Sequence, residues 1–145
     1  MYLTYTQYQD MGGTLDEAAF NDFEFEAEML INWYTFNRLK KPEWTSVLDT
    51  DELKKCVYKL IKLAQERQAA LTTGEATSGE STEGAGASIA SRSNDGVSIS
   101  YNVISAKDVF DTLKTEMEST VRLYLSCVVN ELGRKVLYRG LYPGE

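Results

Sequence analysis

The chain of 145 residues contains no histidine, only two cysteines and only two prolines. Without histidine it lacks the most common general base and the most common metal ligand. Cys56 and Cys127 are too far apart in the sequence to have the spacing of a metal site. The glycine-rich run at residues 74–86 contains no lysine, which excludes a phosphate-binding loop. The sequence therefore predicts a protein that is not an enzyme, with no cofactor and no metal.

Membrane and secretion signals are also missing. No window approaches the ~18 consecutive apolar residues that a membrane-spanning helix needs, and Met1–Thr4 has neither the basic start nor the apolar run of a signal peptide. Each cysteine lies alone in a helical pattern, so we expect both to be small buried apolar side chains in a reducing compartment. A bridge between them has no support. We expect a soluble protein made in the cytoplasm, with no membrane partner.

Basic residues are absent from the first 37 positions, although the chain as a whole has 15 Lys and Arg against 22 Asp and Glu, a net charge of −7. Bases outnumber acids at residues 38–71, and the segment 134–142 has bases only. The acidic and basic segments can pair within one chain or between copies. The overall acidity argues against general nucleic-acid binding, which needs a clustered basic face, but it would let DNA slide past. Glu24 and Glu28 are expected on a solvated or salt-bridged face.

Two capping boxes predict the first helices. Thr4 with Gln7 starts a short helix that Gly12 and Gly13 end. The capping box at residues 14–17 predicts the start of a long helix. This helix is expected to end at Lys41, because the residue before a proline, here Pro42, disfavours the helical conformation. Its expected stripe is Leu15, Ala19, Phe23, Ala27, Leu30 and Tyr34, and further apolar residues are Phe20, Phe25, Ile31, Trp33 and Phe36. A helix this apolar either packs centrally in a bundle or is shared with another subunit.

Two further long helices are expected. The second runs from Asp51 to about Leu71, with a stripe of Leu53, Val57, Leu60, Ala64 and Leu71. Its lysines form either a solvated face or a face opposed to the acids of the first long helix, in the same copy or the next. The third starts at the cap of residues 105–108 and continues to Leu132, where Gly133 stops it.

The stretch between these two helices does not have a helical pattern. Residues 72–86 have the composition of a flexible linker. Val97 to Val103 then alternates apolar and polar residues, and Asn94-Asp95-Gly96 can form a tight turn back to a partner strand at Ser88–Arg92. The segment is therefore either a hairpin, which needs a surface or a neighbouring strand, or a loop that only resembles one.

The sequence predicts one domain of residues 1–145. It consists of N-terminal helices (1–71), a loop and hairpin insertion (72–105), a C-terminal helix (106–133) and a tail (134–145). The fold class is mainly all-α: a bundle of three long helices plus a short N-terminal helix, with a flexible loop and β-hairpin inserted before the last long helix. The tail is too apolar to fray, so we expect it to dock either on its own body or on a partner.

Several stretches together resemble the head-tail connector proteins of tailed bacteriophages, also called head-completion or adaptor proteins. They are the opening Tyr2-Leu3-Thr4-Tyr5-Thr6-Gln7-Tyr8-Gln9-Asp10-Met11-Gly12-Gly13, the segment Gly96-Val97-Ser98-Ile99-Ser100-Tyr101 and the ending Leu137-Tyr138-Arg139-Gly140-Leu141. Their order and spacing carry the resemblance across nearly the whole chain. Residues 72–86 depart from it, because they are longer and richer in Gly and Ser than the family's loop.

The resemblance implies a structural virion protein at the neck, made in the host cytoplasm. Copies would form a dodecameric ring under the portal, extend the DNA channel without sequence-specific DNA binding, and carry the next neck or tail-terminator protein. The implied portal-binding tail is Lys135, Val136, Leu137, Tyr138, Arg139, Gly140, Leu141 and Tyr142. The implied contacts with a neighbouring subunit or the next ring are Asn94, Gly96, Val97, Ile99, Tyr101 and Val103.

A second hypothesis needs no virion. A small helical module that binds one regulatory partner would also lack catalytic residues and expose apolar surface. The two hypotheses differ in copy number and in whether a portal binds.

Overall fold

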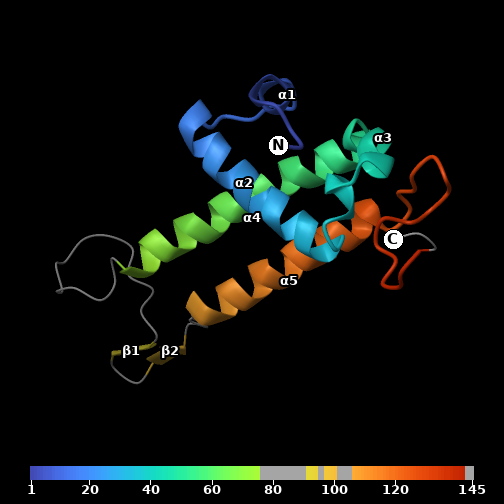
Figure 1. Ribbon diagram of the computed structural model, residues 1–145. Coiled ribbons are helices and arrows are strands. Elements are labelled where there is room, and N and C mark those ends of the chain that lie inside the picture. Colours follow the sequence, from blue (N-terminus) through green and yellow to red (C-terminus); the bar gives the residue numbers. More distant parts are fainter. Residues whose placement is uncertain (76–90, 95–96, 101–105, 143–145) are drawn as a thin grey trace.

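A computed structural model of the chain describes residues 1–75, 91–94, 97–100 and 106–142, with side chains described for residues 1–69 and 111–142. The elements in chain order are α1 (Tyr5–Asp10), α2 (Glu17–Tyr34), the short 3₁₀ helices η1 (Arg38–Lys40) and η2 (Pro42–Trp44), α3 (Thr45–Leu48), α4 (Asp51–Glu75), β1 (Ser91–Asn94), β2 (Val97–Ser100) and α5 (Ala106–Leu125). The predicted mainly all-α class is confirmed. Figure 1 shows α4 and α5 side by side, with α2 crossing α4.

The predicted capping box at the start of α1 is confirmed. The Thr4 amide donates to Gln7 Oε1 at 3.0 Å and the Gln7 amide donates to Thr4 Oγ1 at 3.3 Å. The helix ends at two glycines, as predicted, and Gly12 has a φ of +87°. Gly13 lies so close to the Tyr8 ring that a Cβ there would approach a ring carbon to 2.2 Å. A side chain at this position would displace Tyr8, which is almost fully buried.

Both ends of α2 differ from the prediction. Its N-cap is Asp16, which accepts from the Ala19 amide at 2.9 Å, rather than Thr14. It ends at Tyr34, well before Pro42, because Phe36 and Asn37 adopt left-handed conformations with φ of 54° and 57°. Asn tolerates this conformation better than most residues, and the Asn37 amide donates to the Asn32 carbonyl at 2.8 Å. The chain therefore leaves the helix by a turn that a proline-based prediction does not detect.

The buried face of α2 is rotated from the predicted stripe. Four of its buried positions follow steps of four, three and four, namely Phe20, Glu24, Ala27 and Ile31, and Asn32 is buried next to Ile31. Of the predicted stripe only Ala27 is fully buried, and Phe23, Leu30 and Tyr34 lie half-buried at the edge of the core. The rotation leaves Phe25, Met29 and Trp33 in solvent.

Glu24 corrects the expectation of a solvated or salt-bridged acidic face. Its carboxylate is 3% exposed and accepts the Tyr2 amide at 2.6 Å and the Leu3 amide at 3.4 Å. Glu28, one turn on, does form an ion pair, with the amino group of Met1. Burial of the Tyr2 phenol, assisted by the charge of Glu28, raises its pKa to about 12. The phenol therefore stays protonated and donates to Asn32 Oδ1 at 2.5 Å.

Helix α4 is the central element of the fold. The predicted positions Leu53, Val57, Leu60 and Ala64 are buried, and so are Cys56, Ile61 and Leu63 beside them. This wide apolar face packs against α2 on one side and α5 on the other. Arg67 reaches Glu26 of α2 at 2.7 Å, so one of the expected acid–base pairs forms within a single copy. The helix continues to Glu75 rather than ending near Leu71, and thus includes the first residues of the predicted linker.

Helix α5 ends at Leu125, not at Leu132. An asparagine turn follows the end of the helix and prevents it from continuing to Leu132: Asn130 Oδ1 accepts the amides of Leu132 at 3.1 Å and Arg134 at 3.0 Å. Side chains of this type compete with the helix for backbone donors. Gly133, with a φ of +71°, lies in this turn and does not cap the helix. The turn lets Val129 pair with Lys135 and directs the last residues back onto the body.

The strands β1 and β2 pair antiparallel, with Ser91 opposite Ser100 and Asn94 opposite Val97. Asp95 and Gly96 of the predicted turn lie outside the described residues. The first strand begins at Ser91 rather than Ser88, and Asn94 belongs to the strand instead of the turn. Residues 76–90 of the predicted linker and partner strand lie outside the described residues.

The two cysteines are both free, but only one is buried. Burial raises the pKa of the Cys56 thiol to about 12, whereas Cys127 is exposed, contrary to the expectation for it. Because the thiolate is the nucleophile, a maleimide should label only Cys127 in the native protein and both thiols after unfolding in urea. Intact-mass spectrometry of the labelled chain, with Cys127→Ser as the control, tests this. Labelling of Cys56 in the native protein would contradict the packing of α4.

Candidate protein-interaction surfaces

The predicted tail is folded onto its own body, and Arg38 holds it there. The Arg38 side chain is 3% exposed. Its Nη1 donates to the carbonyl oxygens of Val136, at 3.2 Å, and of Tyr138, and its Nη2 donates to the carbonyl of Gly140 at 2.6 Å. A guanidinium has several donors in one plane, so a single side chain can satisfy three carbonyls of the turn and loop at residues 136–140.

Tyr142 closes the same contact. Its hydroxyl donates to the Lys135 carbonyl at 3.0 Å, and its ring lies 5.2 Å from the Arg38 guanidinium and 5.3 Å from that of Arg134. The ring centroid of Tyr138 is 4.9 Å away. A Cβ at Gly140 would approach Tyr138 ring atoms to 2.6 Å, so a side chain there would have to move the Tyr138 ring. Of the two placements left open by the sequence, docking on the chain's own body is the one observed.

Docking divides the eight predicted tail residues into two groups. Val136 is fully buried, and Leu137, Gly140 and Tyr142 are half-buried. Lys135, Tyr138, Arg139 and Leu141 remain exposed, Leu141 by 84%. A partner can therefore reach four of the eight side chains freely without displacing the tail, and Val136 is not among them.

A row of exposed apolar side chains runs along α2 and just past its end. We call Phe25, Met29, Trp33 and Phe36 the α2 apolar face; their exposed fractions are 63%, 52%, 71% and 56%. Phe25, Met29 and Trp33 border a groove of about 470 Å³. The groove is also lined by Leu60, Ala64, Arg67 and Met117. Soluble monomers seldom expose large contiguous apolar patches, which usually mark interaction sites. The sequence left central packing and sharing with another subunit open, and the structure leaves this side of α2 uncovered.

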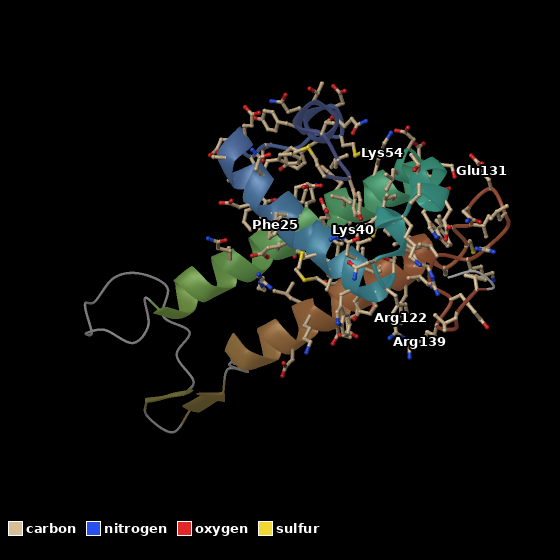
Figure 2. All side chains as sticks on the ribbon, viewed as in Figure 1. Phe25, Lys40, Lys54, Arg122, Glu131 and Arg139 are labelled. Atoms are coloured by element: carbon tan, nitrogen blue, oxygen red, sulfur yellow. The ribbon has the colours of Figure 1, made fainter. Side chains whose placement is uncertain are left out.

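A basic pocket lies where α5 meets the docked tail. It has a volume of about 290 Å³ and is lined by Tyr34, Arg122, Ser126, Lys135, Leu137, Tyr138 and Arg139. Figure 2 shows Arg122 and Arg139 at the same corner of the molecule, below the end of α2. A second hollow of about 300 Å³ shares Tyr34, Arg122 and Arg139 and continues to Trp33, Phe36 and Glu118. Partial burial, and next to it Glu118, raise the pKa of Tyr34.

The sequence did not single out this pocket. Lys135 and Arg139 were noted as part of a basic tail, but Arg122 belongs to a different element and meets them only through the fold. The early end of α5 brings them together, because the turn at Asn130 reverses the chain. No spacing rule within one helix could have identified the set.

The other predicted contact residues lie at the far end of the molecule. Asn94 is in β1, and Val97 and Ile99 are in β2, whereas Gly96, Tyr101 and Val103 lie outside the described residues. Figure 1 shows the strand pair at the opposite end of α4 and α5 from the C-terminal segment. The two predicted contact regions are therefore not brought together into one site.

Other kinds of site are not found in the part of the chain that the structure describes. There, no group of three or more Cys, Asp or Glu side chains is arranged to hold a metal ion, and no helix has the length and apolar character needed to cross a bilayer. Comparison with known proteins finds no matching family model, no matching curated protein and no matching solved structure.

Proposed function

We propose that this chain is a head-tail connector of a tailed bacteriophage, a structural and non-enzymatic protein of the virion neck. Copies assemble into a dodecameric ring under the portal, extend the DNA channel and carry the next neck or tail-terminator protein. The motif resemblance at the two ends and the middle of the chain supports this function. The structural observation that best supports the connector function is the α2 apolar face, because neighbouring copies in a ring would cover a surface that one copy leaves exposed.

The arrangement of elements fits this proposal. Helices α2 and α5 both pack against α4. In the proposed connector these three helices would be the bundle, with α1 beside it, and the strands β1 and β2 would be the inserted hairpin. The hairpin residues Asn94, Val97 and Ile99 would contact a neighbouring subunit or the next ring. The exposed side of the docked tail would face the portal with four side chains, Lys135, Tyr138, Arg139 and Leu141.

Charge supports the same assembly. All seven acids of residues 1–37 lie in α1, in α2 or at the start of α2, with no base among them. Arg122, Lys135 and Arg139 gather at the other end of α2. A heterologous contact that places the acidic region of one copy near Arg122 of the next would be complementary and would leave Lys135 and Arg139 to the portal. Heterologous contacts close into rings when the rotation permits. DNA would pass the remaining acidic surface without sticking.

Mixing the purified chain with the portal protein encoded nearest to its gene tests the proposal. Electron microscopy should show rings of the chain attached to one face of the portal. Sedimentation gives the copy number of the chain alone, which separates a ring from a regulatory module that binds one partner. A monomer that does not bind the portal at any concentration tested would contradict the connector function.

A further inference from the structure

Helix α5 borders a second groove, to which α2 contributes no residue. This hollow of about 740 Å³, which we call the α4–α5 groove, is lined by Lys59, Glu116, Ser119, Thr120, Arg122 and Leu123. It shares no residue with the groove beside the α2 apolar face, which α5 borders only through Met117. Leu123 lies six positions after Met117, roughly 240° further around the helix. The two grooves therefore lie on different sides of α5.

The α4–α5 groove has an apolar side chain exposed in it. Leu123 is 75% exposed, and its neighbours in the groove include the small residues Ser119 and Thr120. One exposed leucine is common on a protein surface, but this one lies in a hollow between two packed helices. Rows of side chains on one helix pack into the grooves formed by others. The groove is thus suited to a helix with an apolar row.

The α2 apolar face is such a row. Phe25, Met29 and Trp33 follow one another at intervals of four residues, the spacing of a ridge on a helix surface. All three are more than half exposed. Because α2 already packs against α4 of its own copy with its other side, this ridge can reach the α4–α5 groove of another copy only.

Charge disfavours the alternative in which two α2 faces contact each other. Residues 17–34 contain acids and no base. Asp22 and Glu26 are both exposed and flank Phe25 in the sequence. Two α2 faces placed together would bring these acids of one copy toward those of the other, and like charges repel.

The α4–α5 groove carries the opposite charge. Two cations, Lys59 and Arg122, line it with one acid, Glu116. An acidic helix placed there meets a net positive groove, while its apolar row meets Leu123. Charge and shape therefore favour the same occupant, helix α2 of another copy.

We propose that the α4–α5 groove of each copy receives the α2 apolar face of the next copy. Leu123 packs against the ridge of α2, and Lys59 and Arg122 face Asp22. Each copy offers a ridge on one side and a groove on another, so the contact is heterologous and repeats from copy to copy. The inference rests on the proposed function and deepens it, because it names the surface on which the neighbouring α2 docks.

Cross-linking of the full chain tests the contact. Met29→Cys and Leu123→Cys are placed in one chain, with Cys127→Ser to remove the exposed native thiol, and a short bismaleimide is added. A denaturing gel should show a ladder that extends beyond the dimer, because each copy is joined to two neighbours. The matched control, Gln9→Cys with Leu123→Cys, has its other thiol at an exposed position of α1 and should give no ladder.

Two results would overturn the inference. One is a strong dimer band from chains with Met29→Cys and Cys127→Ser alone, which would show two α2 faces in contact. The other is the absence of cross-links between chains with Met29→Cys and Leu123→Cys at every concentration tested. That result would leave the α2 apolar face to a different protein.

Charge reversal tests the pairing independently. Arg122→Asp should weaken self-association roughly tenfold in sedimentation, and adding Asp22→Arg to the same chain should restore most of the loss. Lys55→Asp makes the same charge change at an exposed position of α4 and should have little effect. If Asp22→Arg fails to restore association, Asp22 does not lie at the groove and the proposed docking is wrong.

The contact and the connector function can fail separately. Portal-bound rings without the cross-linked ladder would overturn the contact and leave the connector function standing. A ladder without portal attachment would contradict the connector function and support the contact.

Discussion

Replacing Arg38 with alanine should destabilise the folded chain by about 3 kcal/mol or more. A hydrogen bond to a charged group contributes about 1.5–3 kcal/mol, and Arg38 donates to the carbonyls of Val136, Tyr138 and Gly140. Removing the guanidinium would leave these acceptors without their donor and open a gap under the ring of Tyr142. Since domains of this size are stable by about 5–15 kcal/mol, the change removes a large fraction of the total.

The measurement is the urea midpoint followed by circular dichroism, together with limited trypsin digestion. Arg38→Ala should lower the midpoint and expose the tail to cleavage after Lys135 and Arg139. Arg139→Ala is the matched control, because its side chain is exposed and should change stability by less than about 0.5 kcal/mol. Arg38→Lys should be intermediate, because one ammonium group cannot span three carbonyls. Equal midpoints for Arg38→Ala and the wild type would show that the tail docks without this residue.

The second large effect concerns assembly rather than stability. The double substitution Phe25→Glu and Trp33→Glu should weaken self-association roughly a thousandfold. Each buried aromatic at an interface centre commonly contributes about 2 kcal/mol or more, and every 1.4 kcal/mol changes the dissociation constant about tenfold. Both side chains are more than half exposed in one copy, so the thermal midpoint should change little. Sedimentation velocity over a range of concentrations measures the association.

The control for this pair adds the same negative charge elsewhere. Thr6→Glu with Gln9→Glu changes two exposed positions of α1, away from the α2 apolar face, and should leave association intact. If both double variants failed to associate, the added negative charge would explain the loss of association without any contact through the α2 apolar face. Wild-type association in the Phe25 and Trp33 pair would contradict the use of this face as a subunit contact.

The sequence predicted some local interactions correctly. Thr4 and Gln7 lie within one turn and form the expected capping box, whereas the same spacing at Thr14 and Glu17 was wrong because Asp16 caps α2 instead. The α4 stripe of Leu53, Val57 and Leu60 was also correct, because lysines occupy the rest of that helix and the periodicity is clear. In both places local pattern and tertiary packing agree.

The errors arise where local patterns leave a choice that tertiary contacts decide. Helix α2 is apolar over most of its girth, so periodicity could not tell the buried Ile31 from the exposed Trp33. Glu24 is buried because the amides of Tyr2 and Leu3 donate to it, a contact across more than twenty residues. Arg38 had no signal at all, since the carbonyls that it binds lie about a hundred positions later in the chain. Pairings of this kind depend on the whole fold.

The length of α4 sets the distance between the strand pair at one end of the molecule and the docked tail at the other. Its 25 residues, at 1.5 Å per residue, span about 37 Å. The helix continues past the part that α2 covers and leads toward the strand pair, while the tail docks near its first turns. The helix thus acts as a spacer of fixed length between the strand pair and the docked tail. Two partners could bind at opposite ends of it without competing for the same surface.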